Sequence, residues 1–186
     1  MAAPHFTKWY AVTDAKIAAV TADTAASTTY GTLIDVPGIK SVTVSGDINT
    51  VELRGDNTLL DANSTLTNLT VEFEYAKLSL DALAVMAGGT VTDTGATVAE
   101  IATYRRLGSD TFGYFKFEAK TPTAGTDDVT GDGHIVLYKC IMSGFPEIGM
   151  AEEDYKTFSV SATAIPRLFD SRWLDVVINE TAAVIV

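Results

Sequence analysis

Hydrophobic and polar residues alternate most clearly near the middle of the chain. Residues 69–75 place Leu69, Val71, Phe73 and Tyr75 on one side of the pattern and Thr70, Glu72 and Glu74 on the other. Residues 155–166 repeat this period, with Phe158, Val160, Ala162 and Ala164 facing one way. Because the side chains of a strand point alternately to its two faces, each run predicts a β-strand with one buried face.

A short amphipathic helix is expected directly after the first of these strands, over residues 79–87. Ser79 is a good N-cap, and Asp81 places negative charge near the positive end of the helix dipole. Gly88 and Gly89 supply a residue for the helix end that tolerates positive φ. The expected apolar stripe consists of Leu80, Leu83, Ala84 and Ala87. A helix this short must dock on the sheet to be stable.

Shorter patterns predict the remaining strands. Pro37-Gly38 indicates a turn before a strand over 39–45, and residues 112–120 alternate cleanly. Residues 135–144 are apolar on both faces and predict a central strand. Further strands are expected over 6–13, 173–179 and, as one or two strands, 90–105. The Ala- and Thr-rich residues 14–29 have no clear period and predict an irregular connection.

Two turn clusters, Gly46-Asp47 and Gly55-Asp56-Asn57, bracket a short strand over 51–54. Residues 46–63 therefore fit either a long binding loop or a plain hairpin. Taken together, these elements predict a mainly β fold, a sandwich or a barrel, with one short docked α-helix. We expect one domain over 1–186, with an N-terminal arm over 1–29 and an apolar C-terminal tail over 181–186.

Composition narrows the functional classes. The chain has 24 acidic and 13 basic residues, a net charge of −11, which argues against a general nucleic-acid-binding surface because phosphates are bound by Lys and Arg. The single cysteine, Cys140, excludes an internal disulfide framework and lies in an apolar run that predicts burial. No secretory signal and no run of about 20 apolar residues is present, so we expect a soluble chain made in a cytoplasm.

The chain has little catalytic potential. It contains two histidines, His5 and His134, and no nucleophile-elbow, phosphate-loop or zinc-protease motif. We therefore expect no enzymatic activity and no cofactor. The loop from Asp127 to Asp132 has hard oxygen ligands that suit calcium, but its spacing does not match an EF-hand. A solvated hairpin loop explains it better. Trp9 and Trp173 are expected in the core or in subunit contacts.

Several of these stretches, in order, resemble the major tail or tail tube proteins of long-tailed bacteriophages. The resemblance rests on the strand over 37–45, the Gly-Asp-Asn loop at 55–61, the strand and helix over 69–84, and the strand over 155–166 after Phe145-Pro146. It covers roughly residues 30–180 and concerns fold and turns, not catalytic signatures. The Ala- and Thr-rich residues 14–29 are not explained by it.

The resemblance implies a structural virion protein of the tail, assembled in the host cytoplasm. Tail tube proteins form hexameric rings that stack into a hollow tube, and DNA passes through the lumen during infection without specific binding. The implied partners are other copies of the chain, a tape-measure protein, and tail terminator or tail-tip proteins. A membrane is not among them. A tail-tube-like fold is the corresponding expectation for the architecture.

Two sets of residues become candidates on this basis. Thr70, Glu72 and Glu74 are expected to face the lumen, where an acidic and hydroxyl-rich wall would repel DNA; an outward, solvated face is the alternative. Inter-ring contacts are expected from the possible stacking loop at 46–63 and from the tail, with Arg54, Asp56, Val184 and Ile185 as contact residues. Deleting 181–186 should then leave folded subunits that do not polymerise.

A carbohydrate- or cell-surface-binding β-sandwich module is the rival interpretation. Such a module would present exposed aromatic residues on one face or loop, whereas most aromatic residues here lie within alternating strands. It would also bind its ligand as a monomer, while a tube protein self-associates without ligand.

Overall fold

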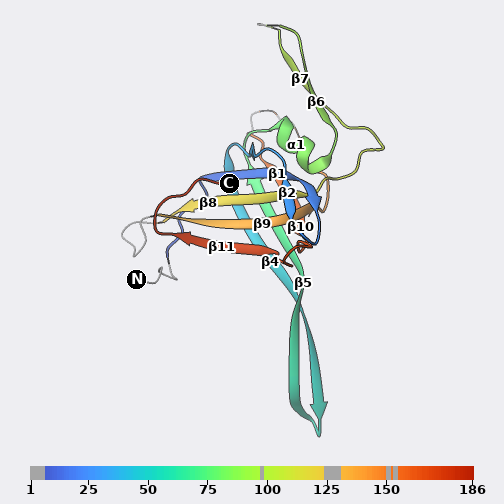
Figure 1. Ribbon diagram of the computed structural model, residues 1–186, viewed down its shortest axis with the longest axis vertical. Helices are drawn as coiled ribbons and strands as arrows, with labels where there is room; N and C mark the ends of the chain where they lie inside the picture. The colour runs from blue at the N-terminus through green and yellow to red at the C-terminus, as the bar shows by residue number, and fades with distance from the viewer. Residues whose placement is uncertain (1–6, 97–98, 124–130, 150–151, 153–154) are drawn as a thin grey trace.

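The computed structural model describes the whole chain except residues 1–6, 97–98, 124–130, 150–151 and 153–154 (Figure 1). The fold is mainly β with one short helix, as the sequence predicts. Its elements are β1 (Asp14–Asp23), β2 (Thr28–Tyr30), β3 (Ile34–Asp35), β4 (Ile39–Gly55), β5 (Thr58–Tyr75), α1 (Leu80–Ala87), β6 (Thr90–Thr94), β7 (Ile101–Arg105), β8 (Phe115–Pro122), β9 (Asp132–Met142), β10 (Phe158–Ala164) and β11 (Leu174–Asn179). No helix of the described residues is long and apolar enough to span a membrane.

Nine of these strands form one antiparallel sheet. Its main path runs β2-β1-β8-β9-β10-β5-β4, with β11 added to β9 and β3 added to β1. β9 is central, because it pairs with β8, β10 and β11. β6 and β7 form a separate two-stranded hairpin that projects from the body near α1 (Figure 1).

The sheet curves so that its two halves face each other across one hydrophobic core, in the manner of a sandwich. Phe73 of β5 stacks on Phe117 of β8 with ring centroids 4.6 Å apart. The buried members of both halves are the apolar positions of the alternating runs: Leu69, Val71, Phe73, Tyr75, Phe115, Phe117, Ala119, Val160, Ala162 and Ala164. The alternation over 69–75 and 158–164 is therefore confirmed as a core face.

The helix α1 closes one end of this core. The Ser79 side chain accepts a hydrogen bond from the backbone N–H of Ala82, as expected of the N-cap. Gly88 ends the helix at φ 74°, where a Cβ atom would lie 2.4 Å from the carbonyl oxygen of Thr111. The predicted stripe is partly wrong. The buried residues are Ala82, Leu83, Met86 and Ala87, whereas Leu80 and Ala84 are only half-buried.

The amino-terminal third differs most from expectation. Residues 14–29 are not an irregular connection: they form β1 and most of β2. Small buried residues on both faces of β1, such as Ala15 and Ala18, hide its period. The strand expected over 6–13 is absent from residues 7–13, where Trp9 makes only an isolated bridge to Thr123.

Of the two alternatives for residues 46–63, the structure shows the plain hairpin and not the binding loop. β4 continues through Gly46-Asp47 with only a shift in register and pairs with β5 as far as Gly55 and Thr58. The chain reverses at Asp56 and Asn57, whose φ angles are 50° and 61°. Two consecutive left-handed residues form the tight hairpin turn that suits the twist of two strands. The plain hairpin is thus the observed structure, and it is unusually long.

Candidate functional site

The outer face of β4, β5 and β10 carries a regular array of polar side chains, which we call the polar face. The strands align three residues in each of three rows: Ser41, Glu74 and Ser159; Thr43, Glu72 and Ser161; Ser45, Thr70 and Thr163. All nine residues are exposed or half-buried, while their neighbours along each strand face the core. The face thus offers seven hydroxyl groups and two carboxylates.

The three predicted lumen residues lie together on this face. Glu72 is exposed, and Glu74 and Thr70 are half-buried. Ser159 donates a hydrogen bond of 3.2 Å to Glu74 Oε1 across the β5–β10 pair. The described residues contain no group of three or more His, Cys, Asp or Glu side chains arranged to hold a metal ion. The chemistry of the face is hydrogen bonding and negative charge.

A shallow open hollow of about 410 Å³ lies at one side of the polar face. Glu72, Ser159 and Ser161 form part of its wall, and the segment Ser143–Phe145 forms another part. Phe145 is 47% exposed at this rim, and Tyr155, which lines a neighbouring hollow with Ser159, is fully exposed. Sequence reasoning placed Tyr155 at the start of an alternating run and Phe145 before it, but did not predict that both side chains would be exposed beside the polar face.

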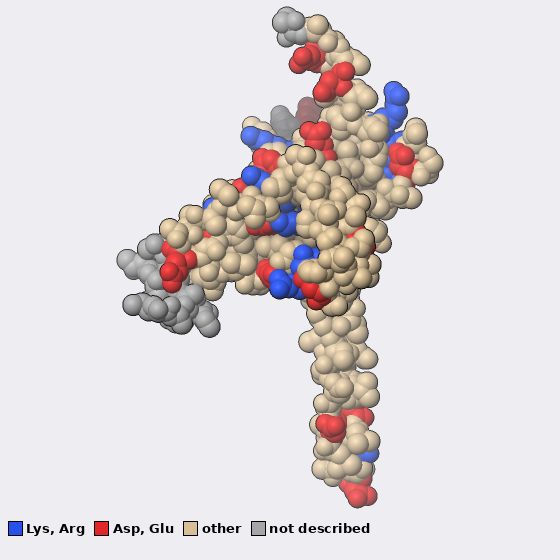
Figure 2. All heavy atoms as spheres, viewed as in Figure 1, with Lys and Arg blue, Asp and Glu red and all other residues tan. Residues whose placement is uncertain are grey.

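The far part of the β4–β5 hairpin, residues 47–67, extends away from the body, and we call it the arm (Figure 1). It exposes six large apolar side chains, each between 48% and 67%: Ile48, Val51, Leu53, Leu59, Leu60 and Leu66. Figure 2 shows a shaft without charged side chains and a charged tip. Arg54 lies at this tip, 2.7 Å from Glu52, and Asp56 forms the turn itself.

The C-terminal segment, residues 181–186, lies along the body instead of extending from it, and we call it the strap. Ile185 is only 4% exposed within its own chain, whereas Val184 and Val186 are each 76% exposed. The structure therefore does not bring the four predicted inter-ring residues together. Arg54 and Asp56 lie at the tip of the arm, far from the strap, and Ile185 is already buried (Figure 1).

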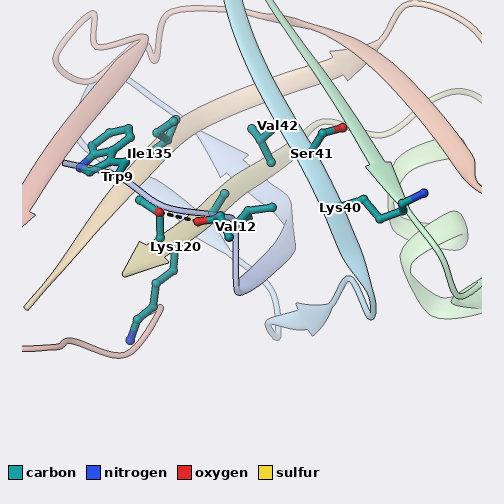
Figure 3. A pocket seen from close by; sticks show the side chains of 10 residues that line it. Trp9, Val12, Lys40, Ser41, Val42, Lys120 and Ile135 are labelled. Carbon is teal, nitrogen blue, oxygen red and sulfur yellow. Dashed lines mark hydrogen bonds between the residues drawn. The ribbon is translucent and has the colours of Figure 1, made fainter. Parts of the chain in front are cut away.

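A groove runs beside the first residues of β4, which pairs only with β5 among the described strands. Figure 3 shows Trp9, Val12, Val42 and Ile135 around it, while the amino groups of Lys40 and Lys120 point away. Its volume is about 280 Å³. Trp9 is 39% exposed there, so it is a half-exposed wall residue rather than a core residue.

Beneath the strap, five charged or titratable residues lie in an arrangement that sequence reasoning did not predict, which we call the ionic row: Lys116, Glu118, Lys120, Asp132 and His134. Burial, the largest single influence, raises the pKa of Asp132, but hydrogen bonds from Lys120, Asn179 and the Ala183 backbone together lower it to about 2. Of the loop from Asp127 to Asp132, which sequence reasoning interpreted as a solvated hairpin rather than a calcium site, only Gly131 and Asp132 are described, and Asp127 lies outside the described residues.

Cys140 is fully buried, and burial raises the pKa of its thiol, which is the behaviour of a structural cysteine.

Compared with known proteins, the sequence matches no family model and no curated protein.

Proposed function

We propose that this chain is a self-assembling structural protein, a subunit of a phage-type tail tube, with its polar face turned toward the lumen. The observation that carries the proposal is the arm, whose six large apolar side chains are each 48% or more exposed among the described residues. The resemblance of the sequence to tail tube proteins indicates the kind of assembly, namely rings that stack into a tube. In this proposal the chain has no catalytic role.

The arm needs a partner for a physical reason. A two-stranded ribbon without a third strand or a packed face is marginally stable in water. Each Å² of apolar surface that another molecule covers stabilises the complex by roughly 25 cal/mol. Several large apolar side chains exposed on one projecting segment indicate a contact with another protein. Another copy of the chain is the partner that a repeating assembly always provides.

The free edge of β4 supports lateral association. Among the described strands, residues 39–46 of β4 pair on one side only, with β5, and such a free edge tends to pair with another chain. If neighbouring copies pair at this edge, the polar faces of successive subunits join into one continuous surface. A head-to-tail contact of this kind closes into a ring when the rotation between neighbouring copies divides a full turn into a whole number of equal steps.

The chemistry of the polar face suits a conduit for DNA. Glu72 and Glu74 carry negative charge and the other seven residues carry hydroxyl groups, so the surface has no Lys or Arg with which to bind phosphate. Repulsion between carboxylates and phosphates keeps a duplex from adhering. A tape-measure protein, a terminator and tail-tip proteins would be the further partners, and the tail of the virion the location.

Arm variants test this proposal. Leu60→Ser changes a side chain of the arm that is 64% exposed, and Leu168→Ser changes one of equal exposure on the body. Sedimentation velocity over a range of protein concentrations should show large assemblies for the unaltered chain and for Leu168→Ser, and a marked loss of them for Leu60→Ser. Equal assembly by all three would contradict the role of the arm, and a monomer in every case would contradict self-assembly.

A carbohydrate-binding module is the second candidate, because Phe145 and Tyr155 are exposed beside the carboxylate and hydroxyl groups of the polar face. Sugar rings stack on exposed aromatic side chains and hydrogen-bond to such groups. In this case the monomer would bind glycans on an array, and Phe145→Ala together with Tyr155→Ala would abolish the binding. An array without any signal would remove this candidate.

A further inference from the structure

The arm has two faces, and the pairing of β4 with β5 assigns each side chain to one of them. Residues that lie opposite each other in the ladder point to the same side, and successive residues of one strand point to opposite sides. Ile48 pairs with Leu66, so both lie on one side. Val51 and Leu53 follow Ile48 by an odd number of positions along β4, so they lie on the other side.

Each face of the arm continues one face of the body. The side of Ile48 and Leu66 continues the core face, because Val44 packs against the core at an equivalent alternate position of β4, and we call it the core-side face. The side of Val51 and Leu53 continues the polar face, and we call it the polar-side face. The register shift after Asp47 skips a residue of β5 and none of β4, so the alternation of β4 runs through it.

The polar-side face changes in character along the arm. Pairs of polar side chains continue from the polar face only as far as Asn49 and Thr65. Val51 and Leu53 then follow on β4, and they are 65% and 60% exposed. Large apolar side chains are stabilised by leaving water, which a DNA-conducting lumen does not allow. The surface that suits a lumen therefore ends within the arm, and the part beyond it needs protein as its cover.

The core-side face needs cover as well. Within the body, the core face is covered by the other half of the sheet. Along the arm, Ile48 and Leu66 remain 67% and 48% exposed. The hydroxyl groups of Thr50 and Ser64, 2.8 Å apart, follow on the same face and satisfy each other. A partner that covered only one face of the arm would leave a large apolar pair on the other face in water.

We propose that the arm inserts as a wedge between two further copies of the chain, with its core-side face against one copy and its polar-side face against the other. This inference rests on the proposed function and names the partners of the arm. A single copy would need a slot that encloses a two-stranded ribbon with side chains on both faces. The two hollows described above are open and measure about 280 and 410 Å³, the size of small-ligand pockets. A repeating assembly offers a gap between bodies wherever two neighbours meet.

Photo-crosslinking within the assembled protein tests the wedge. A benzophenone amino acid replaces Ile48, Val51 or both, and the substituted chain is mixed as a small minority with unaltered chains. Each single substitution should link the arm to one other copy, and the double substitution should give a covalent trimer. Dimers alone from the double substitution would overturn the wedge, because one copy would then hold both faces. Crosslinks from only one of the two positions would overturn it as well.

Failure of the proposed function gives a different result from failure of the wedge. If the chain does not self-assemble, sedimentation shows no large assemblies and neither position links to another copy, so both proposals fall. If assemblies form and the double substitution yields only dimers, self-assembly stands and the wedge is wrong.

Variants of the two faces give a second measurement. Leu66→Ser and Val51→Ser should each raise the protein concentration at which assembly begins by about tenfold, the effect of losing one covered apolar side chain. Combined, they should raise it by about a hundredfold, because contacts with separate partners add in free energy. Asn49→Ser, a polar change on the polar-side face, is the control and should leave this concentration unchanged. All three side chains are exposed, so the body should fold as before. An unchanged concentration for Leu66→Ser or for Val51→Ser would contradict a contact at that face.

Discussion

The carboxylate of Asp132 accepts a 2.8 Å hydrogen bond from the backbone N–H of Ala183, and this contact fastens the strap to the central strand β9. The same carboxylate receives Asn179 Nδ2 at 2.8 Å and lies 2.8 Å from Lys120 Nζ. One buried side chain thus joins β8, β9, β11 and the strap. Its ionisation is expected to govern how this side of the molecule responds to acid.

Asp132 should make the protein sensitive to acid in a defined range. Its pKa is lowered to about 2 in the folded chain, whereas an unfolded Asp titrates near ~3.9. A lowered pKa stabilises the fold above the unfolded value, and the stabilisation is lost as the pH falls from about 4 toward 2. Urea unfolding as a function of pH should show this loss, and Asp132→Asn should reduce it.

Asp56→Asn is the matched control for that experiment, because Asp56 is exposed in the hairpin turn. It should keep the acid response of the unaltered chain. If Asp132→Asn and Asp56→Asn changed the pH profile equally, Asp132 would not be the group responsible.

Ile185 should contribute to the stability of the monomer, because it is buried within its own chain. Ile185→Ala is expected to cost about 2 kcal/mol, the low end for a buried Ile, since the strap can relax around the cavity. Val184→Ala, at 76% exposure, should change the free energy of unfolding by less than about 0.5 kcal/mol. Chemical denaturation of both variants measures the difference.

The burial of Ile185 also changes the result expected from deleting residues 181–186. The deletion removes a cover from the ionic row, so it should lower monomer stability and not only affect polymerisation. A deleted chain as stable as the full chain would contradict the packing of the strap.

Tyr75 is expected to tolerate loss of its hydroxyl group. The side chain is 0% exposed, and its hydroxyl has no hydrogen-bond partner among the described residues. A buried polar group without a partner costs about 1–3 kcal/mol. Tyr75→Phe should therefore unfold at the same or a higher urea concentration than the unaltered chain. A loss of more than about 1 kcal/mol would reveal a hydrogen bond to this hydroxyl.

The polar face predicts a change in adhesion to DNA. Glu72→Lys combined with Glu74→Lys replaces two negative charges by positive ones on a surface that is not part of the core. The variant should stay folded and should retain DNA in a filter-binding assay at low salt, with binding lost as the salt concentration rises. A second variant, Asp93→Lys combined with Glu100→Lys in the β6–β7 hairpin region, is the control, because it changes the net charge by the same amount. Equal DNA retention by both variants would show that only net charge matters.

The sequence predicts the strands whose two faces differ. Residues 69–75 and 158–164 alternate because one face meets the core and the other is the polar face, and the helix follows from its Ser79 cap and glycine end. β1 escapes prediction because small apolar residues are buried on both of its faces, so no period of two remains. A strand of this kind is recognised only from its neighbours in the sheet.

The length of the β4–β5 hairpin and the contacts of the ionic row were not predicted, for other reasons. Gly46-Asp47 has the composition of a turn, but pairing with β5 carries the strand through it, and the true turn is at Asp56-Asn57. Lys116 and Glu118 alternate with buried phenylalanines and therefore resemble a solvent-facing side of β8. The strap that covers them is more than 60 residues away in the sequence, and local patterns carry no information about such a contact.

Negative-stain electron microscopy of the purified, concentrated chain tests the proposed self-assembly most directly. The arm with its uncovered apolar side chains, the free edge of β4 and the polar face together predict rings or hollow tubes of uniform diameter. Particles that remain single monomers at every concentration would contradict the proposal that this chain builds a tube on its own.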